Sequence, residues 1–280
     1  MLHLLLGTLA LRPYVFAFLA VYLALAVPAW GWRRTALYTT LGYALAWAAE
    51  YSSIHTGFPF GLYSYISAPT QDKELWIAGV PFMDSLSFVF LTFAGLQTAR
   101  LALEPLRIRS RGWDLRWASA AAPIRWRTWL LAGLLTMGLD VITDPAALRG
   151  DRWFLGRIYT YPHEGFYWGV PLANFAGWAL LSWAIIGVFL ALDRRVLRPR
   201  WGAWRSYPAD ALWGAGLFAG VLAFNLEVTF AIGEVALGLV GCVWTGVMLV
   251  PILLRVRRQR ELALPAPDRA PVPDAPAIED

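Results

Sequence analysis

Seven apolar segments, each close to the ~20 residues that a helix needs to cross a bilayer, take up most of this chain. The chain is 58% hydrophobic, whereas soluble domains are about 45–50% apolar, and the surplus is concentrated in these segments. We therefore predict an all-α fold, a polytopic transmembrane bundle of about seven helices. The spans are expected at residues 13–30, 35–53, 79–99, 128–145, 169–192, 211–232 and 235–254.

The positive charges alternate from loop to loop, and almost all of them are arginines. Because Arg and Lys are enriched on the cytoplasmic side of membrane proteins, we predict an external N-terminus and a cytoplasmic C-terminus, in a multi-pass protein of the cell membrane. Residues 1–260 are expected to form the membrane domain, and residues 261–280, rich in Pro, Ala and Asp, a disordered tail. No nucleic-acid partner is expected, since the arginines lie in loops between spans and not in one basic groove.

The string Gly-Val-Pro-x-x-(Asp/Asn) occurs twice, at 79–84 and at 169–174. Each copy opens an apolar segment and follows a Tyr-x-Tyr pair, at 63–65 in one case and at 159–161 in the other. A proline fits the first turn of a helix, where its missing N–H has no partner to lose. The repeat predicts two parallel helix-loop-helix units near 35–99 and 128–192, which differ in having Asp84 in the first unit where the second has Asn174.

Acidic side chains within the predicted spans all fall in their external halves. A polar side chain at this depth is costly, and it is a functional-site hypothesis by default. Asp140 and Asp144 are four residues apart, so they share one helix face. For each residue by itself, the alternative is a helix cap or a contact with the headgroup region. We predict that these residues instead share one polar site. Its candidate members are Glu50, Asp84, Asp140, Asp144, Asn174, Asn225 and Glu227.

Aromatic loops follow Glu50 and Asp144, and they contain the two Tyr-x-Tyr pairs. Tyr63, Tyr65 and Tyr161 are therefore expected either to line the polar site or to belong to an aromatic belt at the membrane surface. Trp178 lies one turn after Asn174 and shares its helix face. The chain has three histidines and one cysteine, so no metal site is predicted.

Three motifs lie in or next to these polar segments. Glu50 is followed by Thr-Gly-Phe-Pro-Phe-Gly-x-Tyr-x-Tyr at 56–65, and Asp-x-x-x-Asp-Pro at 140–145 is followed by Gly-Asp-Arg-Trp at 150–153. The third and most specific is Tyr-Trp-Gly-Val-Pro-Leu-Ala-Asn-Phe-Ala-Gly-Trp at 167–178. Together they resemble the membrane-integral carotenoid hydratases of the CruF type, which include the bisanhydrobacterioruberin hydratases. The resemblance covers roughly residues 35 to 250.

The resemblance implies that water adds across the terminal 1,2 double bond of an acyclic, lycopene-like or γ-carotene-like carotenoid. Such a reaction needs an acid that protonates carbon, a held water and no cofactor. Two neighbouring carboxyls divide into an acid and a base. We expect Asp140 or Asp144 to be the acid, Glu50 and Asp84 to position water, and Asn174 to orient it. Aromatic faces such as Trp178, Tyr63 or Tyr161 suit a transient cation. The substrate is expected to come from the lipid bilayer.

Three other functions share parts of this pattern. A carotenoid cyclase uses the same protonation but traps the cation with a second double bond. A UbiA-like prenyltransferase uses paired aspartates, but a second, denser aspartate motif does not occur in this chain. A carotenoid-binding or transport protein also needs polar groups inside the membrane. A retinal protein is excluded, because the last span has no lysine for a Schiff base.

Overall fold

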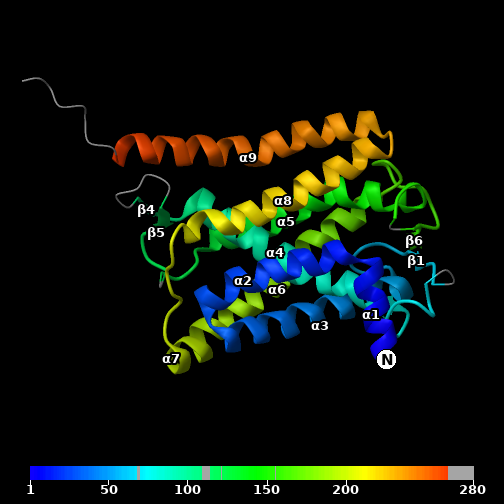
Figure 1. The fold of residues 1–280 in the computed structure, drawn as a ribbon, viewed down its shortest axis with the longest axis horizontal. Coiled ribbons are helices and arrows are strands. Elements are labelled where there is room, and N and C mark those ends of the chain that lie inside the picture. The colour runs from blue at the N-terminus through cyan, green and yellow to red at the C-terminus, as the bar shows by residue number, and fades with distance from the viewer. Residues whose placement is uncertain (68–69, 109–113, 121, 155, 264–280) are drawn as a thin grey trace, which may run out of the picture.

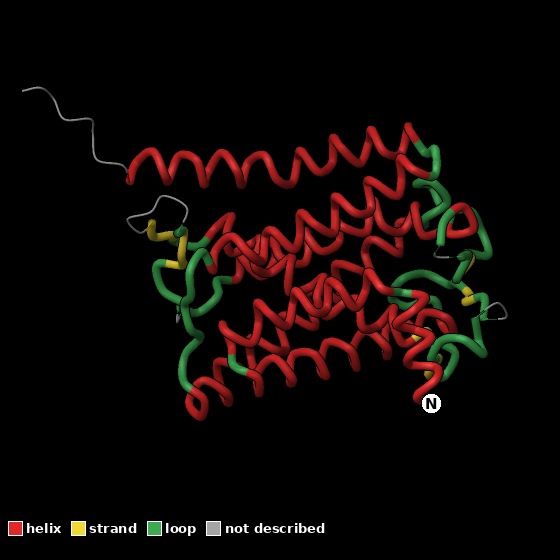
Figure 2. Tube along the Cα trace, viewed as in Figure 1, coloured by secondary structure: helices red, strands yellow, loops and turns green. Residues whose placement is uncertain are grey.

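The computed structural model describes residues 1–67, 70–108, 114–120, 122–154 and 156–263. Within these residues, long helices run side by side in one bundle (Figure 1). The short strands of the described residues lie at the two ends of the bundle (Figure 2). Six helices are long and apolar enough to cross a membrane. This confirms the prediction of an all-α polytopic membrane protein.

Seven helices correspond to the predicted spans. They are α2 (Pro13–Trp30), α3 (Trp32–Thr56), α4 (Phe82–Leu103), α5 (Trp126–Ala147), α6 (Leu172–Leu192), α8 (Asp210–Ala231) and α9 (Val235–Ala263). Two short helices, α1 (Leu2–Leu11) and α7 (Arg198–Trp201), lie at the ends of the bundle. The strands are β1 (Ser64–Tyr65), β2 (Trp76–Ile77), β3 (Val80–Pro81), β4 (Leu106–Ile108), β5 (Leu115–Trp117) and β6 (Tyr159–Thr160).

Two helices depart from the predicted spans. α3 is 25 residues long, but it is not among the six helices apolar enough to cross a membrane, because threonines, tyrosines and charged residues such as Glu50 lower its hydropathy. It packs on α2, α4 and α6. α9 continues to Ala263, three residues past the predicted domain boundary at residue 260. The predicted disorder of the tail concerns residues 264–280, which lie outside the described residues.

α4 is the central helix of the bundle. It packs against α2, α3, α5, α6, α8 and α9, and nearly all of its side chains are buried. Close contact is possible where small residues face a neighbour: a Cβ on Gly95 would lie 2.1 Å from the hydroxyl of Thr136 on α5. This packing holds the first residues of α4 and the last residues of α5 in fixed positions.

The two Gly-Val-Pro strings form the same local structure. Ile77 pairs with Val80 and Tyr167 pairs with Val170, so the glycine that opens each string is the second residue of a two-residue turn. Both central residues of each turn have positive φ, 49° and 81° at Ala78-Gly79 and 47° and 90° at Trp168-Gly169, as a type I′ turn requires. Pro81 and Pro171 then stand in extended conformation just before α4 and α6. The predicted first-turn position of the prolines was wrong by one residue, because the hairpin still holds them.

The two Tyr-x-Tyr segments pair with each other. β1 and β6 form an antiparallel ladder in which Ser64 lies opposite Thr160 and Tyr65 opposite Tyr159. If a local two-fold axis relates the two helix-loop-helix units, their equivalent segments meet in antiparallel orientation, as β1 and β6 do. We call this end of the bundle, with the loops 57–81 and 148–171, the acidic end, because the carboxyl groups described below lie there.

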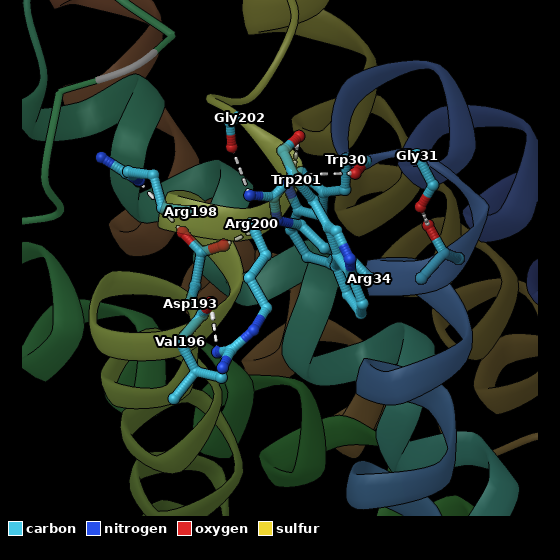
Figure 3. A network of polar contacts seen from close by, with 10 residues as sticks. Trp30, Gly31, Arg34, Asp193, Val196, Arg198, Arg200, Trp201 and Gly202 are labelled. Atoms are coloured by element: carbon cyan, nitrogen blue, oxygen red, sulfur yellow. Dashed lines mark hydrogen bonds and ion pairs between the residues drawn. The ribbon is translucent and has the colours of Figure 1, made fainter.

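The opposite end, with the loops 104–125 and 193–209, is held by buried arginines, and we call it the basic end. Arg34 donates to Asp193 with Nε 2.7 Å from Oδ1, and Arg198 binds the other oxygen of the same carboxylate at 3.0 Å (Figure 3). The Arg34 guanidinium also donates to the carbonyls of Trp30 and Gly202. One arginine therefore joins the ends of α2, α3, α6 and α7, a network that the sequence analysis did not predict.

Candidate functional site

A cavity lies between the helices at the acidic end. The cavity and its mouth hold about 990 Å³ of space that no atom fills. Side chains from six helices and from both Tyr-x-Tyr segments line it. The predicted site residues among them are Glu50, Tyr63, Tyr65, Asp84, Asp140, Asp144, Tyr161, Asn174, Trp178 and Asn225.

The repeated string positions Asn174 between two carboxyl groups. Asn174 lies near the start of α6, and its amide nitrogen is 2.6 Å from Oδ2 of Asp140 and 3.3 Å from Oδ2 of Asp144. An amide nitrogen has two hydrogens, so it can donate one to each carboxyl. The four-residue spacing on α5 directs both aspartates to this side of the helix, as predicted. The structure thus gives Asn174 a role in holding the two carboxyl groups together.

Asp144 accepts hydrogen bonds from three side chains. The hydroxyl of Tyr159 donates to its Oδ1, and the hydroxyl of Tyr161 donates to its Oδ2 at 3.0 Å, in addition to Asn174. Burial raises the pKa of both tyrosines, and the neighbouring Asp144 carboxylate raises it further. Both hydroxyls therefore keep their protons and act as donors. Three donors stabilise Asp144 as an anion.

Asp140 has a different environment, although it is one turn away. It is fully buried, and its only hydrogen-bond partner among the described residues is Asn174. Its Oδ1 is buried and has no hydrogen-bond partner in the described part of the chain. A carboxyl oxygen without a donor is poorly suited to hold negative charge and well suited to carry a proton. The two aspartates thus form an unequal pair.

The first unit contributes a second pair of carboxyl groups. Glu50, near the end of α3, accepts a hydrogen bond of 2.6 Å from the hydroxyl of Ser85. Asp84 precedes Ser85 at the start of α4 and is partly buried in the cavity lining. Burial raises the pKa of Tyr65, and the carboxyl groups of Asp84 and Glu50 raise it further. Tyr65 therefore also remains a protonated hydroxyl next to these acids.

The tyrosine rings connect the two halves of the site. The ring of Tyr63 lies 6.0 Å from those of Tyr159 and Tyr161, and the ring of Tyr65 lies 6.4 Å from that of Tyr159. Trp178 contacts Phe88 at 4.3 Å between ring centroids, and both line the cavity. A carbocation formed here would face several aromatic rings, which attract positive charge.

One predicted member of the site lies outside it. Glu227 is exposed and does not line the cavity, whereas Asn225 is buried and does. Two residues apart on a helix means roughly 200° of rotation, so the two side chains point to opposite sides of α8. The prediction that Glu227 shares the site is therefore corrected. Asn225 donates to the carbonyl of Val221 at 2.9 Å, which fixes its orientation toward the cavity.

The sequence analysis missed other residues that shape the site. Tyr159 is the first tyrosine of its Tyr-x-Tyr pair, so the repeat was a signal that could have found it. Ser85 directly follows the repeated string, but nothing in the sequence pairs it with Glu50. Tyr14 and Phe224 line the cavity from α2 and α8, where uniformly apolar segments give no periodic signal. Among the described residues, no three His, Cys, Asp or Glu side chains are grouped so as to hold a metal ion.

The fold and the site together define an integral membrane protein with a buried acidic cavity at one end of its helices. The sequence profile of the carotenoid biosynthesis proteins matches residues 2–245, and the chain belongs to this family. The match includes every residue that lines the cavity. No curated protein and no solved structure matches the chain. The protein therefore has a role in carotenoid biosynthesis.

Proposed function

We propose that the protein hydrates the terminal 1,2 double bond of an acyclic carotenoid end group and leaves a tertiary hydroxyl at C1. The observation that carries this proposal is the unequal pair of aspartates. Among the described residues, one carboxyl has a buried oxygen without a partner, and the other accepts three hydrogen bonds. Water addition to an alkene needs an acid and a base of this kind next to each other.

In the proposed reaction, Asp140 is the general acid. Its Oδ1 hydroxyl gives a proton to C2, the π electrons form the new C–H bond, and a tertiary cation remains at C1. Among the described residues, Asp140 has no donor at Oδ1 that would hold it as an anion, so it keeps the proton that this step transfers. The rings of Trp178, Tyr63 and Tyr161 face the cavity where the cation forms.

Asp144 is the base in this proposal. Water attacks C1 and forms the C–O bond, and it loses one proton to Asp144. That proton then returns to Asp140, so the protein ends the cycle unchanged and the substrate gains one water. The reaction involves no net oxidation or reduction, and so it needs no redox cofactor. Tyr159, Tyr161 and Asn174 hold Asp144 during the cycle.

Glu50 and Asp84 have a supporting role on the part of the cavity wall that the first unit supplies. They place two more hydrogen-bond acceptors near the tyrosine rings, and Ser85 fixes the position of Glu50. We propose that these carboxyl groups hold the water before it attacks. A polar wall of this kind favours capture of the cation by water over capture by a second double bond, the step that would make the protein a cyclase. The protein would act in the cell membrane.

The test is expression in a host that accumulates lycopene, followed by mass analysis of the pigments. A product heavier by one water supports the hydratase. An isomer of unchanged mass indicates a cyclase, and unaltered lycopene with pigment bound to the purified protein indicates carotenoid binding or transport. Asp140→Asn and Asp144→Asn should each abolish the hydroxylated product while the protein still folds. Full product yield from both variants would refute the assignment of the acid and the base.

A further inference from the structure

The cavity has an apolar arm, by which we mean the part of it whose lining on α2, α4 and α8 carries no acid. It is lined by Tyr14 and Phe18 of α2, by Phe90 and Leu91 of α4, and by Phe224 of α8, with Val221 beside it. Phe224 stacks on Tyr14 with 5.2 Å between ring centroids, and it meets Phe18 edge to face at 5.9 Å. We call these three rings, Tyr14, Phe18 and Phe224, the α2–α8 gate.

Two of the three gate rings lie several residues inside their helices. Phe18 is five residues from the start of α2, and Phe224 is seven residues from the end of α8. At 1.5 Å per residue, the two rings are roughly 8–10 Å from the acidic end of the bundle. All three gate side chains line the cavity and are also partly exposed. At the acidic end, Trp153 and Phe154 pack against Tyr14, and Trp153 also meets Phe224, so the gate lies just beneath these two loop residues.

The backbone next to the gate leaves room. Gly220 lies one turn before Phe224 on α8, and a Cβ on Gly220 would meet only the edge of Phe18, at 3.9 Å. Gly216 lies one further turn away, and a Cβ there would meet nothing within 4 Å. α2 and α8 pack against each other, so the opening depends on ring rotation and not on separation of the helices.

We infer that the α2–α8 gate is the lateral entrance through which the end of the polyene passes from the bilayer into the cavity. This inference rests on the proposed function for the identity of the occupant. An acyclic carotenoid is apolar along its whole length, and moving it through water would cost about 0.8 kcal/mol for each CH₂-sized unit exposed. A lateral entrance lets the end group reach Asp140 and Asp144 while the rest of the chain stays in lipid.

The experiment enlarges position 220 in steps, with Gly220→Ala, Gly220→Leu and Gly220→Phe, and makes the same changes at Gly216 as matched controls. Each variant is purified and checked for folding, then assayed in vesicles with lycopene and in detergent with a short acyclic isoprenoid alcohol that bears the same terminal double bond. We expect lycopene conversion to fall with side-chain size at 220, by about tenfold or more for Phe. Conversion of the short alcohol should be retained, and the Gly216 series should match wild type with both substrates.

Several results would overturn the entrance. Equal lycopene conversion across the Gly220 series would do so, and so would parallel loss of both substrates, because position 220 would then shape the reaction site. If Gly220→Phe does not fold, Gly220→Leu decides.

Pigment that co-purifies with the protein is a readout that does not depend on activity. If wild type converts neither substrate, the proposed hydration fails. The entrance still stands if wild type and Gly216→Phe bind lycopene while Gly220→Phe does not. Phospholipid in place of pigment in wild type would show that the arm holds a lipid chain, and it would overturn the entrance.

Discussion

Asn174→Asp is the change that most directly tests how the two aspartates work together. The substitution keeps the shape of the side chain and replaces its NH₂ group by an oxygen. It removes the hydrogen bonds of 2.6 Å to Asp140 and 3.3 Å to Asp144 and places a third carboxyl group between them. We expect a folded protein in which the acid and the base are no longer held together.

The magnitude follows from the two lost bonds. In the transition state Asp144 is charged and Asp140 becomes charged as it gives up its proton. A hydrogen bond to a charged group contributes about 1.5–3 kcal/mol, so the two bonds together contribute roughly 3–6 kcal/mol there. At about 1.4 kcal/mol for each factor of ten, the rate should fall by ~10²–10⁴-fold. The repulsion between carboxyl groups adds to the loss.

The assay is the initial rate of product formation from lycopene in vesicles, normalised to folded protein. Asn225→Asp is the matched control, since it makes the same chemical change in the same cavity. Within the described part of the chain, the Asn225 side chain donates only to Val221 of its own helix. The control should lose much less activity. If Asn174→Asp stays within about threefold of wild type, or if Asn225→Asp is equally damaging, the reasoning is refuted.

Three further outcomes are expected. Tyr159→Phe should lower the rate about ten- to a hundredfold, because it removes one donor to Asp144. Tyr167→Phe is the control and should not lower the rate, because the Tyr167 hydroxyl has no partner in the described residues. Equal rates for the two variants would contradict this. Arg34→Met should destabilise the protein by about 3–5 kcal/mol in thermal unfolding, because it breaks a buried ion pair. Arg33→Met is the control and should not have this effect, because Arg33 is exposed. Arg149 and Arg152 lower the pKa of Glu234, so the charged Glu234 stabilises the folded protein and Glu234→Gln should be less stable than wild type at neutral pH. This difference in stability should disappear as the pH falls through the lowered pKa. A difference from wild type that persists in acid would argue against the prediction.

The sequence was sufficient to predict the helices. Runs of apolar residues specify membrane spans locally, since every backbone group must find its partner within the helix. α2, α5 and α8 accordingly begin and end within two residues of the predicted spans. The orientation of the bundle stays a prediction from the arginines.

The sequence also indicated most of the cavity residues, because polar groups are rare and conspicuous in apolar segments. It failed at Glu227, where charge alone suggested membership. Side-chain direction decides that point, and direction depends on how α8 is rotated against its neighbours. The aromatic arm was missed for the opposite reason, since Phe18 and Phe224 look like any lipid-facing residue of their spans.

By itself, the sequence determined the fold class, the repeated strings that precede two of the helices and the set of carboxyl groups near one end of the helices. These are properties of local backbone chemistry and of the cost of polar groups in lipid. Only the tertiary structure decided that β1 pairs with β6 and that Asn174 bridges Asp140 and Asp144. It also decided that Asp144 receives three donors, while one oxygen of Asp140 has no partner among the described residues. Such differences arise from packing between residues distant in the chain, which no local pattern encodes.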